Sequence, residues 1–355
     1  MVPPTTPRTV VVLAAGEGTR MRSSLPKVLH PLAGKPMLRR VLDVADALQA
    51  RQVCVIVAPH AHTAIDAACG PHYHYIPQYE RRGTAHALLQ ALPAITATDG
   101  EVVVLFGDTP LLQADTVARV IADKQTHHAT LGLLSFDVPA PHNYGRIVRD
   151  TAGQVVAIVE AKNCDDAQRL IREANSGIMV ISWQWLREAL PRIQPDSISN
   201  EYYLTDLIAM AVNELGVGAV RAVTTSDLSD AWGVNDRSQL ATAEALLHER
   251  TCNRLLRYGV TITNPALVTI EPEVIIAADC VIQPGSVLRG QTQIGANCVI
   301  GPQTTIDDSV VGAGCTILHS IVKQGTIPAD TQVAPFSYIV GAVAPRIDKE
   351  EAGSL

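Results

Sequence analysis

Aliphatic residues recur every six positions after Gly259, and this repeat constrains the fold more than any other feature of the sequence. It is carried by Ile276, Ile282, Leu288, Ile294, Ile300 and Ile306. Such a hexad predicts a β-helix, in which each coil has three short strands and the recurrent side chain points inward. Three to four coils fit before the tail, so we expect a short β-helix.

Cysteines follow the same repeat. Cys280 and Cys298 are separated by one whole coil, and Cys315 follows after a coil whose register loses one residue near Val310 and Val311. The three thiols are therefore expected to stack inside the β-helix. A thiol ladder that holds a soft metal is the alternative, but small buried cysteines are the commoner arrangement.

The first part of the chain has a different organisation. Apolar runs at residues 10–13, 53–57 and 102–106 alternate with helical patterns at 37–48 and 84–92. This alternation predicts an α/β fold, with parallel strands joined by crossover helices and ligands at the carboxyl ends of the strands. We expect a first domain over residues 1–237, a linker helix over 238–258, a β-helix over 259–345 and a tail over 346–355.

Composition narrows the classes of function. With 47% hydrophobic and 18% charged residues, the chain is expected to be folded over most of its length. A net charge of −7 disfavours binding to nucleic acid or to an anionic membrane surface. The N-terminus has no long apolar segment, and the seven cysteines form no C-x-x-C pair. We therefore expect a cytoplasmic protein with reduced thiols.

A glycine-rich segment, LAAGEGTRM at residues 13–21, follows the first predicted strand. Its glycines allow the backbone to approach a ligand closely, and successive N–H groups can surround phosphate oxygens. The segment is no dinucleotide fingerprint, because the third glycine of that motif would fall at Met21, and it contains no P-loop. A tight strand-to-helix connection is the alternative.

Charged residues near this segment suit a triphosphate. Arg20 and Lys27 can neutralise phosphate charge, although basic residues in loops are usually only solvated. Asp108 stands two residues beyond the strand at 102–106, where a carboxylate together with substrate phosphates can hold Mg²⁺. A simple turn at Asp-Thr-Pro is the alternative.

Polar groups flank three apolar runs in the middle of the chain, at NYGRI (143–147), IVEAKN (158–163) and ANSGI (174–178). Fixed acceptors, amides and glycines of this kind suit a sugar, although each segment alone is more typical of an ordinary turn. The histidine pairs of the chain have no zinc-site spacing, and we do not expect them to bind metal.

Residues 13–38, LAAGEGTRMRSSLPKVLHPLAGKPML, closely resemble the bacterial GlmU family of bifunctional N-acetylglucosamine-1-phosphate uridyltransferases and glucosamine-1-phosphate acetyltransferases. The match continues in order through residues 78–84, FGD, NYGRI, IVEAK, ANSGI, EYYLTD at 201–206, GVNDR and the start of the hexads. It implies a Rossmann-like nucleotidyltransferase domain with a mixed, mainly parallel sheet, then a linker helix and a short left-handed β-helix. It also implies Mg²⁺-dependent transfer of a uridylyl group from UTP to N-acetylglucosamine 1-phosphate, by in-line attack on the α-phosphate.

The resemblance implies a role for each matching position. On the nucleotide side, it places Leu13, Ala14, Ala15 and Gly16 against the nucleotide, Arg20 and Lys27 at its phosphates, and Gln78, Gly83 and Thr84 at the uracil. On the metal and sugar side, it assigns Mg²⁺ to Asp108 and Asn235 and the amino sugar to Gly145, Glu160 and Asn175, with Phe106 and Gly107 lining the same pocket. Arg20, Lys27 and Asp108 are the expected catalytic residues.

The chain departs from the family pattern in three places. Arg81 stands where relatives usually carry a second glutamine, and Phe106 where a tyrosine is common. The hexads also stop soon after residues 334–341, so we expect no acetyl transfer. The same chemistry on another pair (a thymidylyl- or guanylyltransferase), a catalytically silent nucleotide-sugar binding subunit and an acyltransferase are the alternatives. The resemblance implies that the β-helix serves structure and assembly, through association as a homotrimer.

Overall fold

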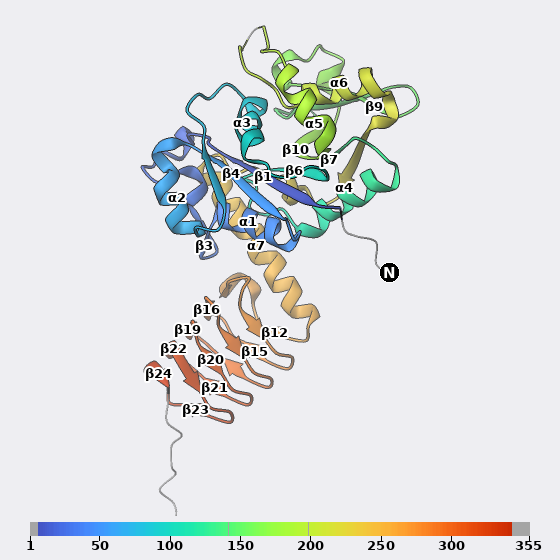
Figure 1. Ribbon diagram of the computed structural model, residues 1–355. Helices are drawn as coiled ribbons and strands as arrows, with labels where there is room; N and C mark the ends of the chain where they lie inside the picture. The colour runs from blue at the N-terminus through green and yellow to red at the C-terminus, as the bar shows by residue number, and fades with distance from the viewer. Residues whose placement is uncertain (1–5, 141, 198, 343–355) are drawn as a thin grey trace, which may run out of the picture. The chain divides into compact units, whose positions relative to one another are not determined.

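The structure is a computed structural model that describes residues 6–140, 142–197 and 199–342 (Figure 1). By its internal contacts, the chain divides into two compact units, Met1–Ala243 and Glu244–Leu355. The first unit contains a large sheet covered by helices. The second contains the end of helix α7 and a stack of short strands. The predicted tail at 346–355 lies outside the described residues.

The sheet of the first unit has the order β11-β7-β10-β6-β1-β4-β5, with β8 and β9 attached beside β10. Its strands are β1 (Arg8–Ala14), β4 (Gln52–Val57), β5 (His74–Pro77), β6 (Glu101–Phe106), β7 (Leu131–Asp137), β8 (Arg146–Arg149), β9 (Val155–Val159), β10 (Glu173–Ser182) and β11 (Val220–Thr225). On the main path β10 runs against all the others, because it pairs antiparallel with both β6 and β7. Two further short strands, β2 (Pro31–Leu32) and β3 (Lys35–Pro36), form a separate hairpin.

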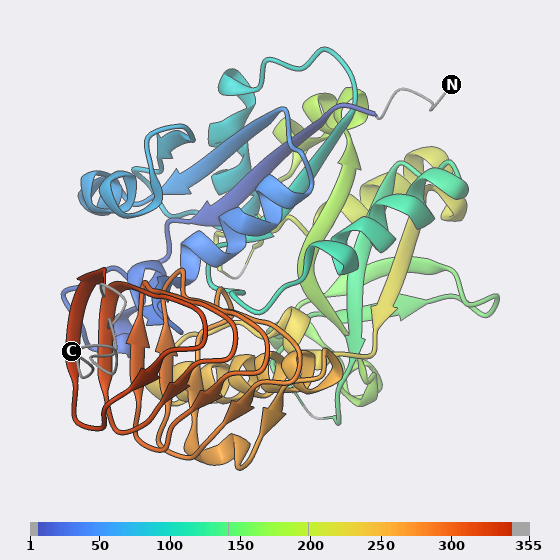
Figure 2. The ribbon, with the colours of Figure 1, turned by 90° about the horizontal axis from the view of Figure 1, so that it is seen from below.

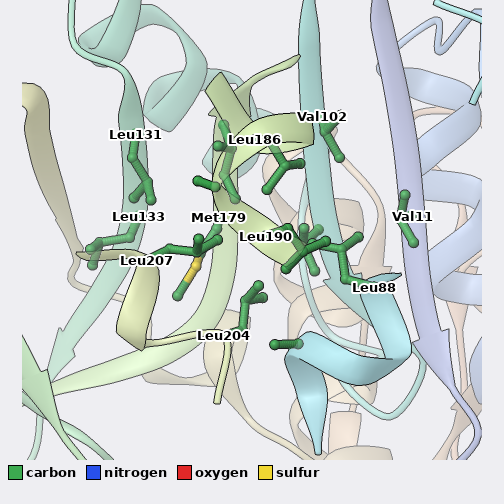
Figure 3. Packing of buried hydrophobic residues seen from close by; sticks show 14 of the residues in the cluster. Val11, Leu88, Val102, Leu131, Leu133, Met179, Leu186, Leu190, Leu204 and Leu207 are labelled. Carbon is green, nitrogen blue, oxygen red and sulfur yellow. The ribbon is translucent and has the colours of Figure 1, made fainter. Parts of the chain in front are cut away.

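Helices cover both faces of this sheet. They are α1 (Met37–Ala47), α2 (His62–Cys69), α3 (Thr84–Ala91), α4 (Ala114–Thr126), α5 (Trp183–Ala189) and α6 (Asp206–Leu215). Side chains alternate along a strand, so Val10 of β1 joins one core with α1, α2 and α4, whereas Val11 joins the other with α3, α5 and α6. Figure 3 shows the second core, where Leu88 of α3 and Leu207 of α6 pack with Val102 and Met179 of the strands.

Helix α7 (Arg237–Arg257) links the two compact units along the chain. It ends where Tyr258 N–H donates to Arg254 O at 3.1 Å and Gly259 adopts a φ of +85°, a conformation that glycine enters without steric cost. No helix in the described part of the chain is both long enough and apolar enough to span a bilayer.

Parallel rungs of short strands follow α7, as Figure 2 shows in orange and red. One face holds β12 (Thr261–Ile262), β15 (Val281–Ile282), β18 (Val299–Ile300), β21 (Thr316–Ile317) and β23 (Gln332–Val333). The other faces hold β13 (Thr269–Ile270), β16 (Val287–Arg289), β19 (Thr305–Asp307), β22 (Ile321–Ile327), β24 (Tyr338–Ala342), β14 (Ile275–Ile276), β17 (Gln293–Ile294) and β20 (Val310–Val311). This arrangement is a left-handed β-helix.

The hexad residues form the interior of the β-helix, and Ile282, Ile300 and Ile317 stack in register within it. The thiols of Cys280, Cys298 and Cys315 are also fully buried, and each donates to a backbone carbonyl of the next coil at 3.0–3.1 Å. Burial raises the pKa of each of the three thiols, so they stay protonated in this interior.

The predicted fold class is confirmed: a mixed, mainly parallel α/β sheet precedes a left-handed β-helix. The expected number of coils is wrong, because one face of the described β-helix has five stacked strands rather than three or four. The reason is that the later coils are shorter than the regular ones. Ile294 pairs with Val311 and Thr305 pairs with Ile321 in the next coil. Both pairs are closer together in the sequence than Ile276 and Ile294, which pair in the same way.

Substitution of a central hexad residue should destabilise the β-helix. Ile300 is fully buried between Ile282 and Ile317, so Ile300→Ala should lower the free energy of unfolding of this unit by about 2–5 kcal/mol. Urea titration followed by circular dichroism measures the change. Gln293→Ala, at an exposed position of β17, is the matched control. A loss below about 1 kcal/mol at Ile300 would contradict this packing.

Candidate active site

A cavity of about 320 Å³ opens at the carboxyl ends of β1, β5 and β6 in the first unit. The residues that line it are Leu13, Ala14, Ala15, Gly16, Lys27, Val28, Gln78, Arg81, Gly83, Thr84, Ala87, Phe106, Asp108, Glu201 and Tyr203. Ligands of open α/β sheets bind at this edge, where strands end and loops begin. The structure therefore brings most of the predicted nucleotide-side residues to one cavity.

The glycine-rich loop after β1 packs directly on Lys27. Gly18 has a φ of +62°, and a Cβ atom placed on it would overlap the Cβ of Lys27. Only glycine fits there, because any side chain would push the lysine stem away. Lys27 begins the short 3-10 helix η2 (Lys27–Leu29), and only 8% of its surface is exposed. The loop thus covers the stem and directs the ammonium group toward the cavity.

Two oxygen acceptors meet at the Lys27 ammonium. Its Nζ lies 2.5 Å from Asp108 Oδ2 and 3.3 Å from Asn235 Oδ1. Asn235 is far from Asp108 in the sequence, but Val234 N–H donates to Asp108 O at 2.8 Å and draws the two segments together. Asn235 N–H also donates to Gln239 Oε1 at 2.7 Å, which fixes the start of α7 beside the site.

This oxygen pair fits a hard divalent cation. Mg²⁺ prefers one or two carboxylate or carbonyl oxygens completed by water and substrate phosphates, and Asp108 with Asn235 supplies one oxygen of each kind. The side chain of Asp108 is 22% exposed, so its carboxylate remains accessible from the cavity. The described residues contain no group of three or more His, Cys, Asp or Glu side chains arranged around a metal site.

The start of α3 forms another part of the cavity wall. Gly83 adopts a φ of +102°, and a Cβ atom on it would overlap Tyr202 O. Tyr202 N–H donates to Arg82 O at 2.7 Å, and Leu204 N–H donates to Thr84 Oγ1 at 3.1 Å. The EYYLTD segment is therefore joined to the wall that carries Gln78, Gly83 and Thr84, which explains why Glu201 and Tyr203 also line the cavity.

Gly145, Glu160 and Asn175 form a second polar group. Asn175 N–H donates to Gly145 O at 2.9 Å, and a Cβ atom on Gly145 would lie 3.6 Å from Glu160 Oε2. A register shift in β10 after Asn175 turns Gly177 toward the ring of Phe106, which lines the cavity. The second polar group therefore adjoins the cavity through Phe106, although its members are not cavity-lining residues.

Carboxylates concentrate around the second polar group. Glu160 Oε1 accepts a hydrogen bond from Thr205 Oγ1 at 2.9 Å. Burial raises the pKa of the Asp206 carboxyl above its ordinary value, and the nearby carboxylates of Glu160 and Asp196 add to the rise. A negative environment of this kind suits hydroxyl and amide donors of a sugar rather than its phosphate.

Besides Asn235 and the second polar group, two more predicted residues do not line the cavity. Arg20 is exposed on the 3-10 helix η1 (Thr19–Met21) and does not line the cavity. Gly107 lies behind the wall, where a Cβ atom would be 3.0 Å from Ala14 Cβ. Arg81 lines the cavity and forms an ion pair with Glu17 of the glycine-rich loop, a contact that no sequence motif indicated.

Comparison with protein families agrees with the fold. Residues 10–178 match the family described as MobA-like NTP transferase domain, and residues 273–308 match the bacterial transferase hexapeptide family of six repeats. The chain is thus a nucleotidyltransferase-type α/β protein with a hexapeptide-repeat β-helix.

Curated relatives define the family more closely. The chain is 42% identical to the bifunctional protein GlmU of Brevibacillus brevis, over 93% of this chain and 71% of that protein. It is 39% identical to GlmU of Marinobacter nauticus, over 93% of this chain and 72% of the relative. It is 36% identical to GlmU of a Nostoc species, over 94% of this chain and 72% of that relative. The chain belongs to the GlmU family.

Proposed function

We propose that this chain transfers a uridylyl group from UTP to N-acetylglucosamine 1-phosphate, giving UDP-N-acetylglucosamine and pyrophosphate. The observation that carries this proposal is the convergence of Lys27, Asp108 and Asn235 beside a cavity that Gln78, Gly83 and Thr84 also line. The first group suits phosphates with a cation, and the second suits a base. Family membership supports the same activity.

Positioning accounts for most of the proposed catalysis. The phosphate of the sugar substrate is ionised near neutral pH, so its oxygen attacks the α-phosphorus without a protein base, and pyrophosphate leaves from the opposite side. Lys27 neutralises phosphate charge as the attack proceeds, and Arg20 is proposed to approach the phosphates from the exposed η1. Bound Mg²⁺, held by Asp108 and Asn235, would add charge neutralisation at the phosphates.

On the sugar side, Glu160 and Asn175 are proposed to bind hydroxyl and acetamido groups. Gly145 leaves room for the ring, since a Cβ atom there would lie 3.0 Å from Ile158 Cγ2 and 3.6 Å from Glu160 Oε2. Phe106 supplies an apolar wall that the ring can cover. This arrangement orders the sugar so that its phosphate faces the Lys27 side of the cavity.

A grid of substrates tests the proposal. Pyrophosphate release with Mg²⁺ is measured for UTP, dTTP, GTP, CTP and ATP, each with several sugar 1-phosphates. We expect turnover with UTP and N-acetylglucosamine 1-phosphate to exceed every other combination. Preference for another pair would retain the chemistry but refute the substrates, and binding without turnover would point to a silent nucleotide-sugar binding subunit.

Thr205→Val should weaken binding of the sugar phosphate. The Thr205 side chain is nearly buried and donates to Glu160, so its loss frees the carboxylate to rotate. We expect KM for N-acetylglucosamine 1-phosphate to rise about 3- to 10-fold, with KM for UTP unchanged. Thr205→Ser keeps the donor and should restore the native KM. Equal KM values in both variants would show that Thr205 does not orient Glu160.

Three further expectations remain part of the proposal. The enzyme is proposed to act in the cytoplasm and to assemble as a homotrimer through its β-helix, which light scattering of the purified protein tests directly. The expected lack of acetyl transfer is tested in parallel with acetyl-CoA and glucosamine 1-phosphate.

A further inference from the structure

Gln78 contacts a residue behind the cavity wall. Its side chain lines the cavity and is 4% exposed, and its Nε2 lies 3.1 Å from Nδ1 of His86. His86 belongs to α3 but does not line this cavity. The amide of Gln78 therefore has one end toward the imidazole and leaves the other for a ligand.

The imidazole is itself held in place. Gln90, one turn further along α3, places Nε2 3.4 Å from the other ring nitrogen of His86 and donates to His86 O at 3.1 Å. The ring of Tyr202 lies 6.3 Å from the imidazole, centroid to centroid. The result is a row of three side chains, Gln78, His86 and Gln90, that leads away from the cavity.

A neutral imidazole donates at one ring nitrogen and accepts at the other, whereas an amide offers an oxygen acceptor and a nitrogen donor. Gln78 presents its Nε2 donor to Nδ1, so Nδ1 is the acceptor and the other ring nitrogen carries the proton. Gln90 then holds the residue through its hydrogen bond to His86 O rather than through that ring nitrogen. The end of the Gln78 amide that faces the cavity is determined as well. Without His86, both orientations of the amide would be available to the ligand.

Amide orientation matters for pyrimidine bases. Uracil presents a carbonyl oxygen and an N3–H donor where cytosine presents an amino donor and an unprotonated N3 acceptor. A Gln78 amide held in one orientation complements the groups of one base and places a like group against those of the other base. Leaving a buried polar group unpaired opposite the wrong base is what makes such a contact discriminate.

We propose that His86, held by Gln90, is a positioning residue that fixes the Gln78 amide and thereby sets the preference of this chain for uracil over cytosine nucleotides. The inference rests on the proposed uridylyltransferase function. His86 acts only through Gln78 and does not touch the nucleotide.

Kinetics of the purified full chain test this role. His86→Leu should lower the ratio of kcat/KM for UTP to that for CTP by about 3- to 10-fold, mainly through a higher KM for UTP, with kcat for UTP nearly unchanged. Gln90→Leu should shift the ratio in the same direction by less. His74→Leu, an exposed histidine of β5, is the matched control and should leave the ratio unchanged.

A double-mutant cycle separates positioning from a general structural effect. In the Gln78→Leu background, His86→Leu should cause no further loss of discrimination, because the amide that it orients is gone. UTP binding measured by calorimetry without the sugar phosphate should follow the same pattern. Additive effects, or a ratio within twofold of wild type in His86→Leu, would overturn the proposal. No turnover of UTP by wild-type protein would instead refute the proposed function.

Discussion

Asp108→Asn should lower kcat about 10²- to 10³-fold, the largest effect that we expect from a single substitution in this chain. The substitution keeps the size of the side chain but removes the negative charge at the point where Lys27 Nζ and Asn235 Oδ1 converge. Steady-state pyrophosphate release at saturating UTP measures the loss. KM for the sugar phosphate should change little, because Glu160 and Asn175 lie in a separate group of residues.

Two controls make the Asp108 result decisive. Asp115→Asn removes an exposed carboxylate at the start of α4 and should leave kcat unchanged. Breaking a partly buried ion pair destabilises a protein by up to about 3–5 kcal/mol, so thermal unfolding must show that Asp108→Asn is folded at the assay temperature. Near-native turnover in a folded Asp108→Asn protein would remove Asp108 from the catalytic machinery.

Lys27→Met should reduce kcat/KM for UTP by about 10²-fold. Methionine preserves most of the apolar stem that packs beneath Gly18, whereas the ammonium beside Asp108 is lost. A second readout is binding of Mn²⁺ to the nucleotide-free protein. The ammonium and a divalent cation are attracted to the same two oxygens, so Mn²⁺ should bind the variant more tightly than wild type.

Lys323→Met, at an exposed position of β22, is the matched control and should change neither readout. Weaker binding of Mn²⁺ in Lys27→Met would show that Lys27 supports the cation site instead of sharing its oxygens. Unchanged kcat/KM for UTP would show that the ammonium does not act on the phosphates.

Local periodicity explains why the β-helix could be predicted and why its length could not. Each hexad residue is a side chain that points into the β-helix, so the pattern from Ile276 to Ile306 could be recognised without tertiary information. The later coils are shorter, as the pairing of Ile294 with Val311 shows. The six-residue period therefore fails at the point where the count of coils from the sequence ended. The antiparallel direction of β10 was also hidden, because hydrophobic patterning does not encode strand direction.

Some residues of the candidate site could likewise be predicted from the sequence, and others could not. The loop after β1 was recognisable because a glycine-rich segment directly follows an apolar strand. By contrast, Asn235 reaches Asp108 only through the backbone contact of Val234, and family resemblance rather than spacing pointed to that pair. His86 gave no signal at all, since one histidine in an apolar helix has the same appearance whether it is structural or orients a neighbour.

Isotope labelling tests the central claim most directly. N-acetylglucosamine 1-phosphate labelled with ¹⁸O at its three non-bridging phosphate oxygens is incubated with UTP, Mg²⁺ and the protein, and the products are analysed by mass spectrometry. Attack by the sugar phosphate on the α-phosphorus predicts UDP-N-acetylglucosamine that retains all three labels, together with an equal amount of unlabelled pyrophosphate. Label in the pyrophosphate, or no nucleotide sugar at all, would contradict the account.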